Sequence, residues 1–341
     1  MLEKVKLQRF TVFEELKLSF SPGINIFIGE NGTGKTHLMK VLYAACDIIK
    51  EKEKGNFAEK LIKVFLPSKN ALGRLTKRAS GSSSCQIEIT RRLSNNDTRL
   101  LKLSFSNHSM GTPTSVKGMS NWADENPKCV FIPVKDMLAN APGFSSLYEM
   151  RNIHFEEIYV DIIRRAFLPA LKGPATRERK QIENILVNAI NGKVLIQGEE
   201  FFLKNAQGNL EFTLLAEGFR KLGLLWLLLQ NGTLLQGSVL FWDEPETNLN
   251  PKLIQAVISV LLELQRMGVQ IFLATHNYSV LKEFDLQKQK NDQVIFNSMF
   301  RNENGEIVVN STPELVQLVP NAIDETYEQM LGRDIQKNLG L

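Results

Sequence analysis

Polar and apolar residues alternate along the first twenty positions of the chain, which predicts two strands, Val5 to Phe10 and Leu16 to Phe20. After the turn-forming Ser21-Pro22-Gly23, the continuous apolar run Ile24 to Ile28 is typical of a buried strand. A glycine-rich turn follows, and a helix is expected from Lys35 to about Lys50. The order strand, glycine-rich turn, helix is the local context that a phosphate-binding loop requires.

The middle of the chain is predicted to form a β-hairpin and then a helical lobe. Residues 51 to 85 look helical and then loop-like, and the residues on both sides of the turn-prone Asn95-Asn96-Asp97 alternate as strands do. From about His154 to Ala189 the apolar residues have helical spacing, interrupted at Gly173-Pro174. The strands expected before this lobe are Gln86 to Arg92, Leu100 to Ser106 and the buried Val130 to Pro133.

Strands and helices alternate in the last third of the chain, as they do in α/β proteins. The near-continuous apolar runs Val239 to Asp243 and Val269 to Ala274 predict parallel strands that are covered on both faces. The other expected elements are strands at Lys193 to Gln197, Glu200 to Lys204 and Leu210 to Leu214, helices at Glu217 to Gln230 and Pro251 to Met267, and, from Gln293 onward, a hairpin (Gln293 to Phe296, Glu306 to Val309) with two polar helical stretches.

The composition is that of a globular protein, because 43% of the 341 residues are hydrophobic and 23% are charged. The longest apolar runs, such as Leu222 to Leu229, are far shorter than the roughly 20 residues of a membrane span, and the N-terminus lacks an apolar signal segment. We therefore expect a cytoplasmic protein without a membrane partner. Lys and Arg exceed Asp and Glu by only four (41 against 37), so the net charge is weak support for DNA binding.

The cysteines and histidines give no reason to expect a disulfide framework or a transition-metal site. The three cysteines are far apart, and the four histidines do not cluster with each other or with the cysteines. Any metal should therefore arrive with a nucleotide. The residues in question are Cys46, Cys85, Cys129, His37, His108, His154 and His276.

The clearest candidate chemistry lies in an eight-residue stretch that matches G-x-x-x-x-G-K-[ST] without a departure. Its glycines allow backbone N–H groups to turn toward a β-phosphate, Lys35 can bind the β- and γ-phosphate oxygens, and the Thr36 hydroxyl can ligate Mg²⁺. Between a strand and a helix, these residues predict an ATP site. The stretch is Gly29-Glu30-Asn31-Gly32-Thr33-Gly34-Lys35-Thr36.

Two adjacent carboxylates follow the apolar residues of the strand that ends at Asp243. At the carboxyl end of a buried strand, Asp243 can hold the Mg²⁺ shell and Glu244 can polarise an attacking water. The structural alternative is an acidic turn after a core strand.

Two weaker signals accompany these motifs. Leu215 to Arg220 opens an apolar helix, and Gly218 near its start could leave backbone N–H groups free for an anion, such as the γ-phosphate of a nucleotide bound to another subunit. An ordinary helix N-cap region would look the same. His276 follows the strand that ends at Ala274, at the sheet edge where it could donate a hydrogen bond to a γ-phosphate.

In this order, the four elements resemble the head of an ABC-type P-loop ATPase, and their details resemble the RecF, SMC and OLD branch. The resemblance implies that Gly29 to Thr36 is the Walker A loop, that Asp243 and Glu244 are the Walker B pair, and that His276 is the switch histidine. It implies an α/β fold with a mixed central sheet, an antiparallel β-subdomain and an inserted helical lobe. It also implies ATP hydrolysis, with ATP and Mg²⁺ as cofactors.

The chain departs from the family pattern at three places. Asn248-Leu249-Asn250-Pro251 fits the D-loop, with Asn250 where the family usually has His. Leu215 to Arg220 matches the signature motif in position and in its glycine, but Ala216 replaces the usual Ser, so one hydroxyl contact to a γ-phosphate should be missing. No Gln marks a Q-loop, and Lys135 or Asp136 stands in its place.

The resemblance assigns roles to single residues. Lys35, Glu244 and His276 would act in catalysis, and Thr36 and Asp243 would ligate Mg²⁺. Besides the eight loop residues, nucleotide contacts are expected at His37, Glu217, Gly218 and, for the adenine and ribose, Arg9 and Phe10. An amphipathic first strand explains Arg9 and Phe10 equally well.

One ABC-type head is expected over residues 1–341. It should contain a Walker A lobe with the hairpin (1–135), an inserted helical and β lobe (136–215), a lobe with the signature, Walker B and switch histidine (216–285) and a C-terminal extension (286–341). Because the roughly 65 residues after His276 are too few for the nuclease module of OLD proteins, we expect a stand-alone head.

Two functions remain open at this point. The first is an ATP-dependent homodimer, or a higher oligomer, that controls a separately encoded nuclease or toxin, as OLD-like heads do in bacterial anti-phage defence. The second is a RecF-like protein that binds DNA in an ATP-dependent manner for repair. The helical lobe, Glu246 and the missing signature Ser disfavour the nucleotide-binding subunit of a transporter.

Overall fold

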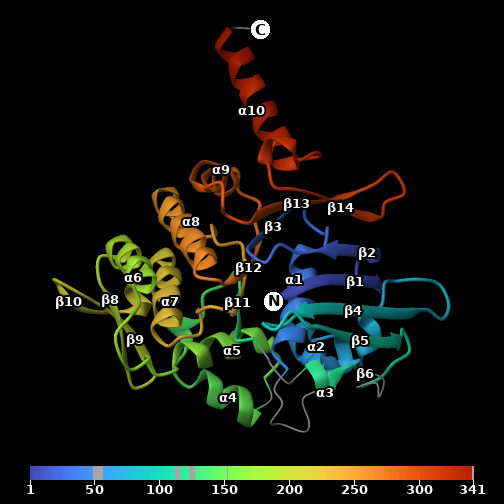
Figure 1. Ribbon diagram of the computed structural model, residues 1–341, viewed down its shortest axis with the longest axis horizontal. Coiled ribbons are helices and arrows are strands. Elements are labelled where there is room, and N and C mark those ends of the chain that lie inside the picture. The colour runs from blue at the N-terminus through green and yellow to red at the C-terminus, as the bar shows by residue number, and fades with distance from the viewer. Residues whose placement is uncertain (49–56, 112–115, 123–126, 152, 340–341) are drawn as a thin grey trace.

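A six-stranded central sheet organises the fold, and the computed structural model describes residues 1–48, 57–111, 116–122, 127–151 and 153–339 (Figure 1). The strand order is β14-β13-β3-β12-β11-β7. β14 runs antiparallel to β13, and the other five strands are parallel to one another. The strands are β3 (Ile24–Ile28), β7 (Cys129–Ile132), β11 (Val239–Asp243), β12 (Gln270–Ala274), β13 (Val294–Arg301) and β14 (Ile307–Thr312).

The central parallel strands are apolar because both faces of the sheet are covered. Successive side chains of a strand point to opposite faces, so Trp242 of β11 enters one core and Phe241 enters the other. On the Phe241 face, four phenylalanines from adjacent strands form a row with neighbouring ring centroids 5.0 to 6.4 Å apart. They are Phe131, Phe241, Phe272 and Phe27.

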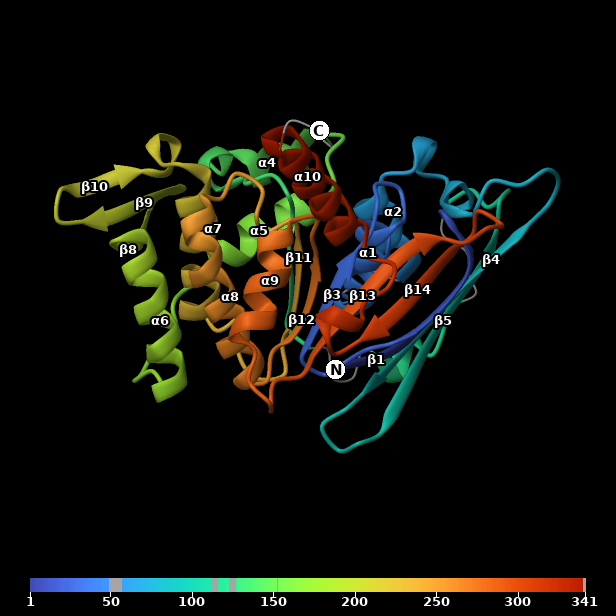
Figure 2. The same cartoon turned by 90° about the horizontal axis from the view of Figure 1, so that it is seen from above.

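Helix α1 (Lys35–Cys46) lies between this row of rings and a second, five-stranded antiparallel sheet of order β2-β1-β4-β5-β6 (Figure 2). Tyr43 packs edge-on against Phe131 and Phe241, with centroids 5.6 and 6.0 Å apart. Leu38 to Cys46 are all buried, as in a helix covered on every side. This layer contains β1 (Leu2–Phe10), β2 (Phe13–Ser19), β4 (Ser84–Arg92), β5 (Thr98–Ser106), β6 (Val116–Lys117), α2 (Phe57–Phe65) and α3 (Met119–Trp122).

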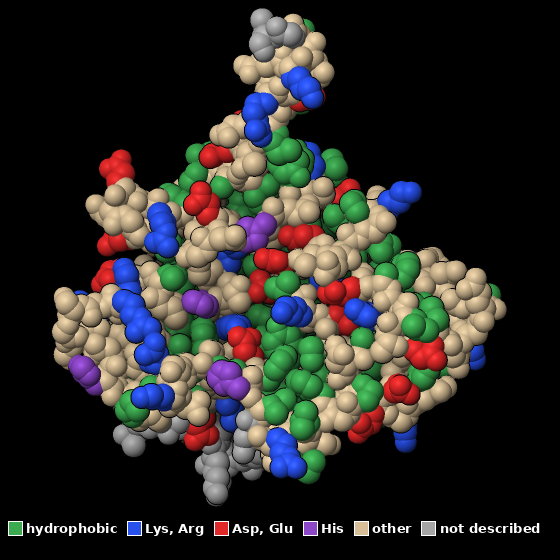
Figure 3. All heavy atoms as spheres, turned by 180° about the vertical axis from the view of Figure 1, so that it is seen from behind, with side chains coloured by type: hydrophobic (Ala, Val, Ile, Leu, Met, Phe, Trp, Pro, Cys, Tyr) green, Lys and Arg blue, Asp and Glu red, His purple; other side chains and the backbone are tan. Residues whose placement is uncertain are grey.

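Helices cover the other face of the central sheet (Figures 1 and 2). Helices α7 and α8 pack on the side of Trp242, and a three-stranded sheet of order β10-β9-β8 lies beyond them. Helix α10 projects away from the rest of the described chain (Figure 3). These elements are α4 (Phe144–Arg151), α5 (Glu157–Ala166), α6 (Arg177–Ile190), β8 (Lys193–Gln197), β9 (Glu200–Asn205), β10 (Gly208–Glu211), α7 (Glu217–Gln230), α8 (Pro251–Arg266), α9 (Tyr278–Gln287) and α10 (Ala322–Leu339).

The predicted α/β fold with a mixed central sheet, an antiparallel β-subdomain and a helical lobe is confirmed, but three local predictions are wrong. The strand expected to reach Leu214 stops at Glu211, because Phe212 begins a 3-10 turn and packs inward 5.7 Å from Phe201. The helix expected to reach about Lys50 ends at Cys46; residues 49 and 50 lie outside the described part. In the tail, only α10 is a full helix, since Leu315–Gln317 forms a single 3-10 turn.

A buried cluster of charges joins α1, α2 and α5. The Lys60 ammonium of α2 lies 2.5 Å from a carboxylate oxygen of Asp47, 2.6 Å from one of Asp161 and 2.9 Å from one of Glu157. Arg165 forms a further ion pair with Asp47. Burial lowers the pKa of Lys60, but the attraction of the carboxylates outweighs it and the pKa is raised. Each carboxylate in this cluster therefore depends on a cation that is equally buried.

Lys60→Met should destabilise the protein by about 3 to 5 kcal/mol, because it leaves carboxylates buried without their shared cation. The free energy of unfolding in urea measures this. The loss should be larger at pH 8 than at pH 5, where the unpaired carboxylates can take up protons. Lys63→Met is the control: Lys63 also lies near Glu157, at 3.3 Å, but its side chain is 56% exposed. Equal losses for the two variants would contradict the structural role of Lys60.

Candidate nucleotide-binding site

The Walker A candidate forms the connection between β3 and α1. β3 ends at Ile28 and α1 begins at Lys35, so Gly29 to Gly34 makes the whole turn. Gly29, Gly32 and Gly34 have φ angles of 141, 80 and 92°, a region that favours glycine. A Cβ on Gly29 would lie 2.1 Å from the carbonyl oxygen of Met299, so this turn touches the backbone of β13.

Lys35 is held inside this turn. Its ammonium donates hydrogen bonds to the carbonyl oxygens of Gly29 at 2.8 Å and Glu30 at 3.0 Å, and the residue is only 6% exposed. Burial lowers its pKa to about 8, although Asp243 and Glu244 attract the charged form. A bound triphosphate would supply the negative charge that this cation lacks.

Asp243 ends β11 beside the Walker A turn. The Thr36 hydroxyl donates to its carboxylate across 2.8 Å. Burial raises the pKa of Asp243 to about 6, against the hydrogen bond from Thr36. A buried carboxylate and a hydroxyl at this separation are hard oxygen donors of the kind that Mg²⁺ takes beside phosphates, so the residues fit the expected ion.

Glu244 has a strained backbone, with φ of 47°. Its N–H donates to the carbonyl oxygen of Ala274 at 2.9 Å, which ties it to the end of β12. One carboxylate oxygen accepts from the Thr247 hydroxyl at 2.9 Å. The other lies 3.8 Å from Nε2 of His276, too far for a hydrogen bond. Glu244 and His276 therefore flank the same opening, each with a side chain that is 35% exposed.

Glu246 has a role that the sequence analysis did not assign. Its carboxylate accepts from the Thr275 hydroxyl at 2.7 Å and from the backbone N–H of His276 at 3.0 Å. It thereby holds the segment that carries His276 against the turn after β11. Burial and Lys35 lower the pKa of His276, which outweighs the attraction of Glu244, so its ring is neutral near pH 7. The second Glu of the Asp243-Glu244-Pro245-Glu246 sequence was the available signal.

The signature candidate lies at the start of α7 and packs against the segment after the Walker B pair. Gly218 is buried, and a Cβ there would lie 3.1 Å from Cδ1 of Leu249 and 3.3 Å from the carbonyl oxygen of Asn248. Glu217 accepts from the Asn248 side-chain amide at 2.8 Å. Ala216 is the N-cap and makes no side-chain capping bond. Glu217 and Gly218 thus contact the D-loop candidate of their own chain.

Comparison with known proteins agrees with this arrangement. The family model described as "AAA domain, putative AbiEii toxin, Type IV TA system" matches residues 112–282, which is half of the chain. The chain belongs to this AAA family. The expected resemblance to ABC-type P-loop ATPases of the RecF and SMC branch is confirmed.

The relatives match the chain locally in sequence and along most of its length in fold. The DNA replication and repair protein RecF of Cytophaga hutchinsonii is 51% identical over 45 residues, 13% of this chain and 12% of that protein. RecF of Limosilactobacillus fermentum is 34% identical over 89 residues, 25% of this chain and 24% of that protein. The chain thus spans about a quarter or less of the length of these curated relatives.

Two solved Smc heads share the fold. The SmcHead bound to the C-winged helix domain of ScpA has a TM-score of 0.60 at 12% identity and covers 91% of this chain and 97% of its own. The Smc head domain from Pyrococcus furiosus, bound to the C-terminal domain of ScpA, has a TM-score of 0.55 at 11% identity, with coverages of 97% and 98%.

Against this ABC-type fold, the expected adenine contact at Phe10 is wrong. The Phe10 ring is fully buried and packs edge-on against Phe65 at 5.7 Å, so it has no face for a base. Arg9 is exposed and pairs with Glu14 at 3.2 Å. The His37 ring also packs near Phe65, with centroids 5.5 Å apart. Periodicity identified Phe10 as a strand residue, but only the packing of α2 shows what covers it.

The Q-loop candidate Asp136 faces the signature helix. Its carboxylate lies 2.8 Å from Nε of Arg220 and is 2% exposed, and burial raises its pKa. Its backbone N–H donates to Glu217 at 3.4 Å. Asp136 therefore stabilises the start of α7, which leaves the expected nucleotide contact at this position without support.

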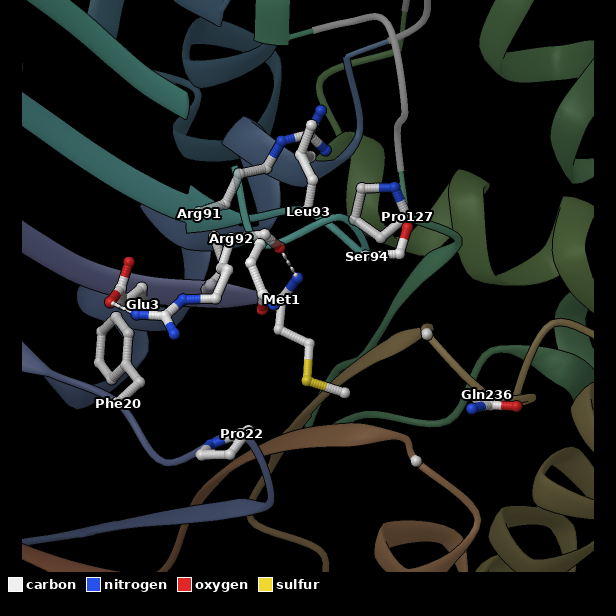
Figure 4. A pocket seen from close by; sticks show the side chains of 14 residues that line it. Met1, Glu3, Phe20, Pro22, Arg91, Arg92, Leu93, Ser94, Pro127 and Gln236 are labelled. Carbon is white, nitrogen blue, oxygen red and sulfur yellow. Dashed lines mark hydrogen bonds and ion pairs between the residues drawn. The ribbon is translucent and has the colours of Figure 1, made fainter. Parts of the chain in front are cut away.

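A cavity of about 810 Å³ opens at the opposite edge of the central sheet (Figure 4). Gly237 and Gly268, which precede β11 and β12, contribute to its wall. The Met1 side chain points into the opening, and Arg92 pairs with Glu3 at its rim. Because the Walker A turn follows the carboxyl end of β3, this cavity is separate from the candidate nucleotide site.

No helix among the described residues is long and apolar enough to cross a membrane.

Gly29→Ala should cost about 3 kcal/mol or more of stability, since the added methyl meets the Met299 carbonyl and the backbone leaves its favoured region. Gly32→Ala is the matched control, because its φ is also positive but a Cβ there meets nothing within 4 Å. Its cost should be about 1 kcal/mol. Urea unfolding of both variants measures the difference. Similar values would mean that the turn does not touch β13 as closely as described.

Proposed function

We propose that this chain binds and hydrolyses ATP and that ATP drives it to dimerise, or to form a higher oligomer, as a switch for a separately encoded effector such as a nuclease or toxin. One observation carries the ATPase part. Lys35, Thr36, Asp243, Glu244 and His276, from three parts of the chain, converge at the carboxyl ends of β3, β11 and β12. No structural role explains so many polar groups in one opening.

The geometry supports a division of labour in hydrolysis. Backbone N–H groups of the Walker A turn and the Lys35 ammonium would bind the β- and γ-phosphates. Thr36 and Asp243 would hold Mg²⁺, whose charge would offset that of the phosphate oxygens. Glu244 would orient a water and accept its proton as the water oxygen bonds to the γ-phosphorus and the bond to ADP breaks. His276, neutral near pH 7, could donate a hydrogen bond to a γ-phosphate oxygen.

Dimerisation follows from the position of the signature candidate. The contacts found for Glu217 and Gly218 in the described residues are with Asp136, Lys221 and the segment after β11, whereas Lys35 contacts the Walker A turn. The start of α7 is therefore available to the nucleotide of a second copy. The family description, which names a putative toxin and a toxin–antitoxin system, supports a separate effector and a role in bacterial defence.

A RecF-like function in DNA binding is the alternative, favoured by the local identity to RecF proteins. It requires ATP-dependent binding to duplex DNA that weakens steeply with salt. Co-purification of a nuclease or toxin, without such DNA binding, would favour the switch.

Glu244→Gln should retain ATP binding and lose hydrolysis, because Asp243 remains for the metal while the group that orients water loses its charge. General-base catalysis contributes about 10²- to 10⁴-fold, so turnover should fall by that factor. Asp243→Asn is the comparison and should weaken Mg²⁺-dependent nucleotide binding itself. Phosphate release and nucleotide affinity are the two measurements. Wild-type turnover in Glu244→Gln would remove Glu244 from the proposed role.

Lys35→Ala should weaken ATP binding about a hundredfold or more, since hydrogen bonds to charged groups contribute about 1.5 to 3 kcal/mol each and Lys35 is placed for several. Isothermal titration with ATP and Mg²⁺ measures this. Lys204→Ala, at an exposed position of β9, removes a cation without touching the site and should bind as the wild type does. If both variants bind equally, the ATP site lies elsewhere.

A further inference from the structure

The turn between β11 and α8 is clamped from two sides. Glu246 fixes one side of it to the segment that carries His276, as described above. On the other side, the Lys221 ammonium of α7 donates to the carbonyl oxygen of Thr247 at 2.6 Å, and Glu217 bonds Asn248. Thr247 therefore lies between the signature candidate and the proposed catalytic glutamate.

Lys221 is an unusual residue for this place. It is 2% exposed, one helical turn after Gly218, and burial lowers its pKa despite the attraction of nearby carboxylates. Its ammonium is 4.0 Å from Glu217, so its shortest polar contact is the one to Thr247. A buried lysine retained at this cost should have a positional role.

The Thr247 hydroxyl decides which way Glu244 faces. It donates to one carboxylate oxygen at 2.9 Å, which leaves the other oxygen directed toward His276. Glu244 also has a positive φ, and Asn248 has a φ of 59°, so neither end of this turn is in a relaxed conformation. Without the hydroxyl, the Glu244 side chain would be free to leave the orientation in which it faces the opening.

We propose that Thr247 is a positioning residue for Glu244, and that Lys221 ties this position to the start of α7. The inference rests on the proposed ATPase function and adds a regulation to it. A ligand that shifts the start of α7 would move Lys221, then the Thr247 carbonyl, and so the orientation of Glu244. The γ-phosphate bound by a second copy is the ligand that the proposed dimer would supply.

Thr247→Val keeps the branched shape and removes the donor, so kcat should fall about 10- to 100-fold while KM and ATP affinity stay within about twofold. Thr247→Ser restores the hydroxyl and should recover most of kcat. Thr326→Val is the matched control, since the Thr326 hydroxyl makes a similar bond, to the carbonyl oxygen of Ala322, in the exposed part of α10. Loss of kcat in Thr247→Ser as large as in Thr247→Val would overturn the role of the hydroxyl.

Lys221→Met tests the link to α7. It should lower kcat, and the double variant with Thr247→Val should be no slower than the more severe single variant by more than about threefold, because the two residues act through one contact. Losses that multiply would overturn the link. If the wild type binds ATP without hydrolysing it, the proposed function itself fails; if the wild type hydrolyses and Thr247→Val matches it, only this inference fails.

Discussion

The parallel pairing of β3, β12 and β11 is the constraint on which the candidate site depends. Their register sets Asp243 opposite Ala274, and Ala274 opposite Phe27. All three strands therefore end at the same edge of the sheet, and the segments that follow them meet there. The row of phenylalanines on one face of these strands supports α1, so the same packing that aligns the strands also orients Lys35 and Thr36.

Buried charge is treated differently in two parts of the molecule. In the cluster around Lys60, cations and carboxylates are equally buried and paired, which makes it a structural joint between α1, α2 and α5. At the nucleotide site, burial moves the pKa values of Lys35 and Asp243 toward neutrality, to about 8 and about 6. Groups whose charges are incompletely compensated are suited to a ligand that brings both a polyanion and a cation.

The turn after β11 connects the parts of the site. It carries Glu244 in a strained conformation, receives Lys221 from α7 and reaches the His276 segment through Glu246. Rigid elements on both sides hold this turn, so a small movement of either side changes the orientation of a side chain in the site. That arrangement suits a switch better than a constitutively active enzyme, in which such links would be unnecessary.

The sequence by itself determined the local chemistry. The Walker A turn between a strand and a helix, the acids after β11 and the alternation that predicted β4 and β5 all depend on near neighbours in the chain, for which spacing and residue type suffice. Tertiary structure alone decided that Phe10 is covered by Phe65, that β13 pairs with β3 in the central sheet, and that Asp136 binds Arg220. It also brought Lys221 to Thr247 and Glu246 to His276. These contacts join residues whose separation in sequence carries no periodic signal, because they are set by how whole helices and strands pack, and packing depends on shape in three dimensions.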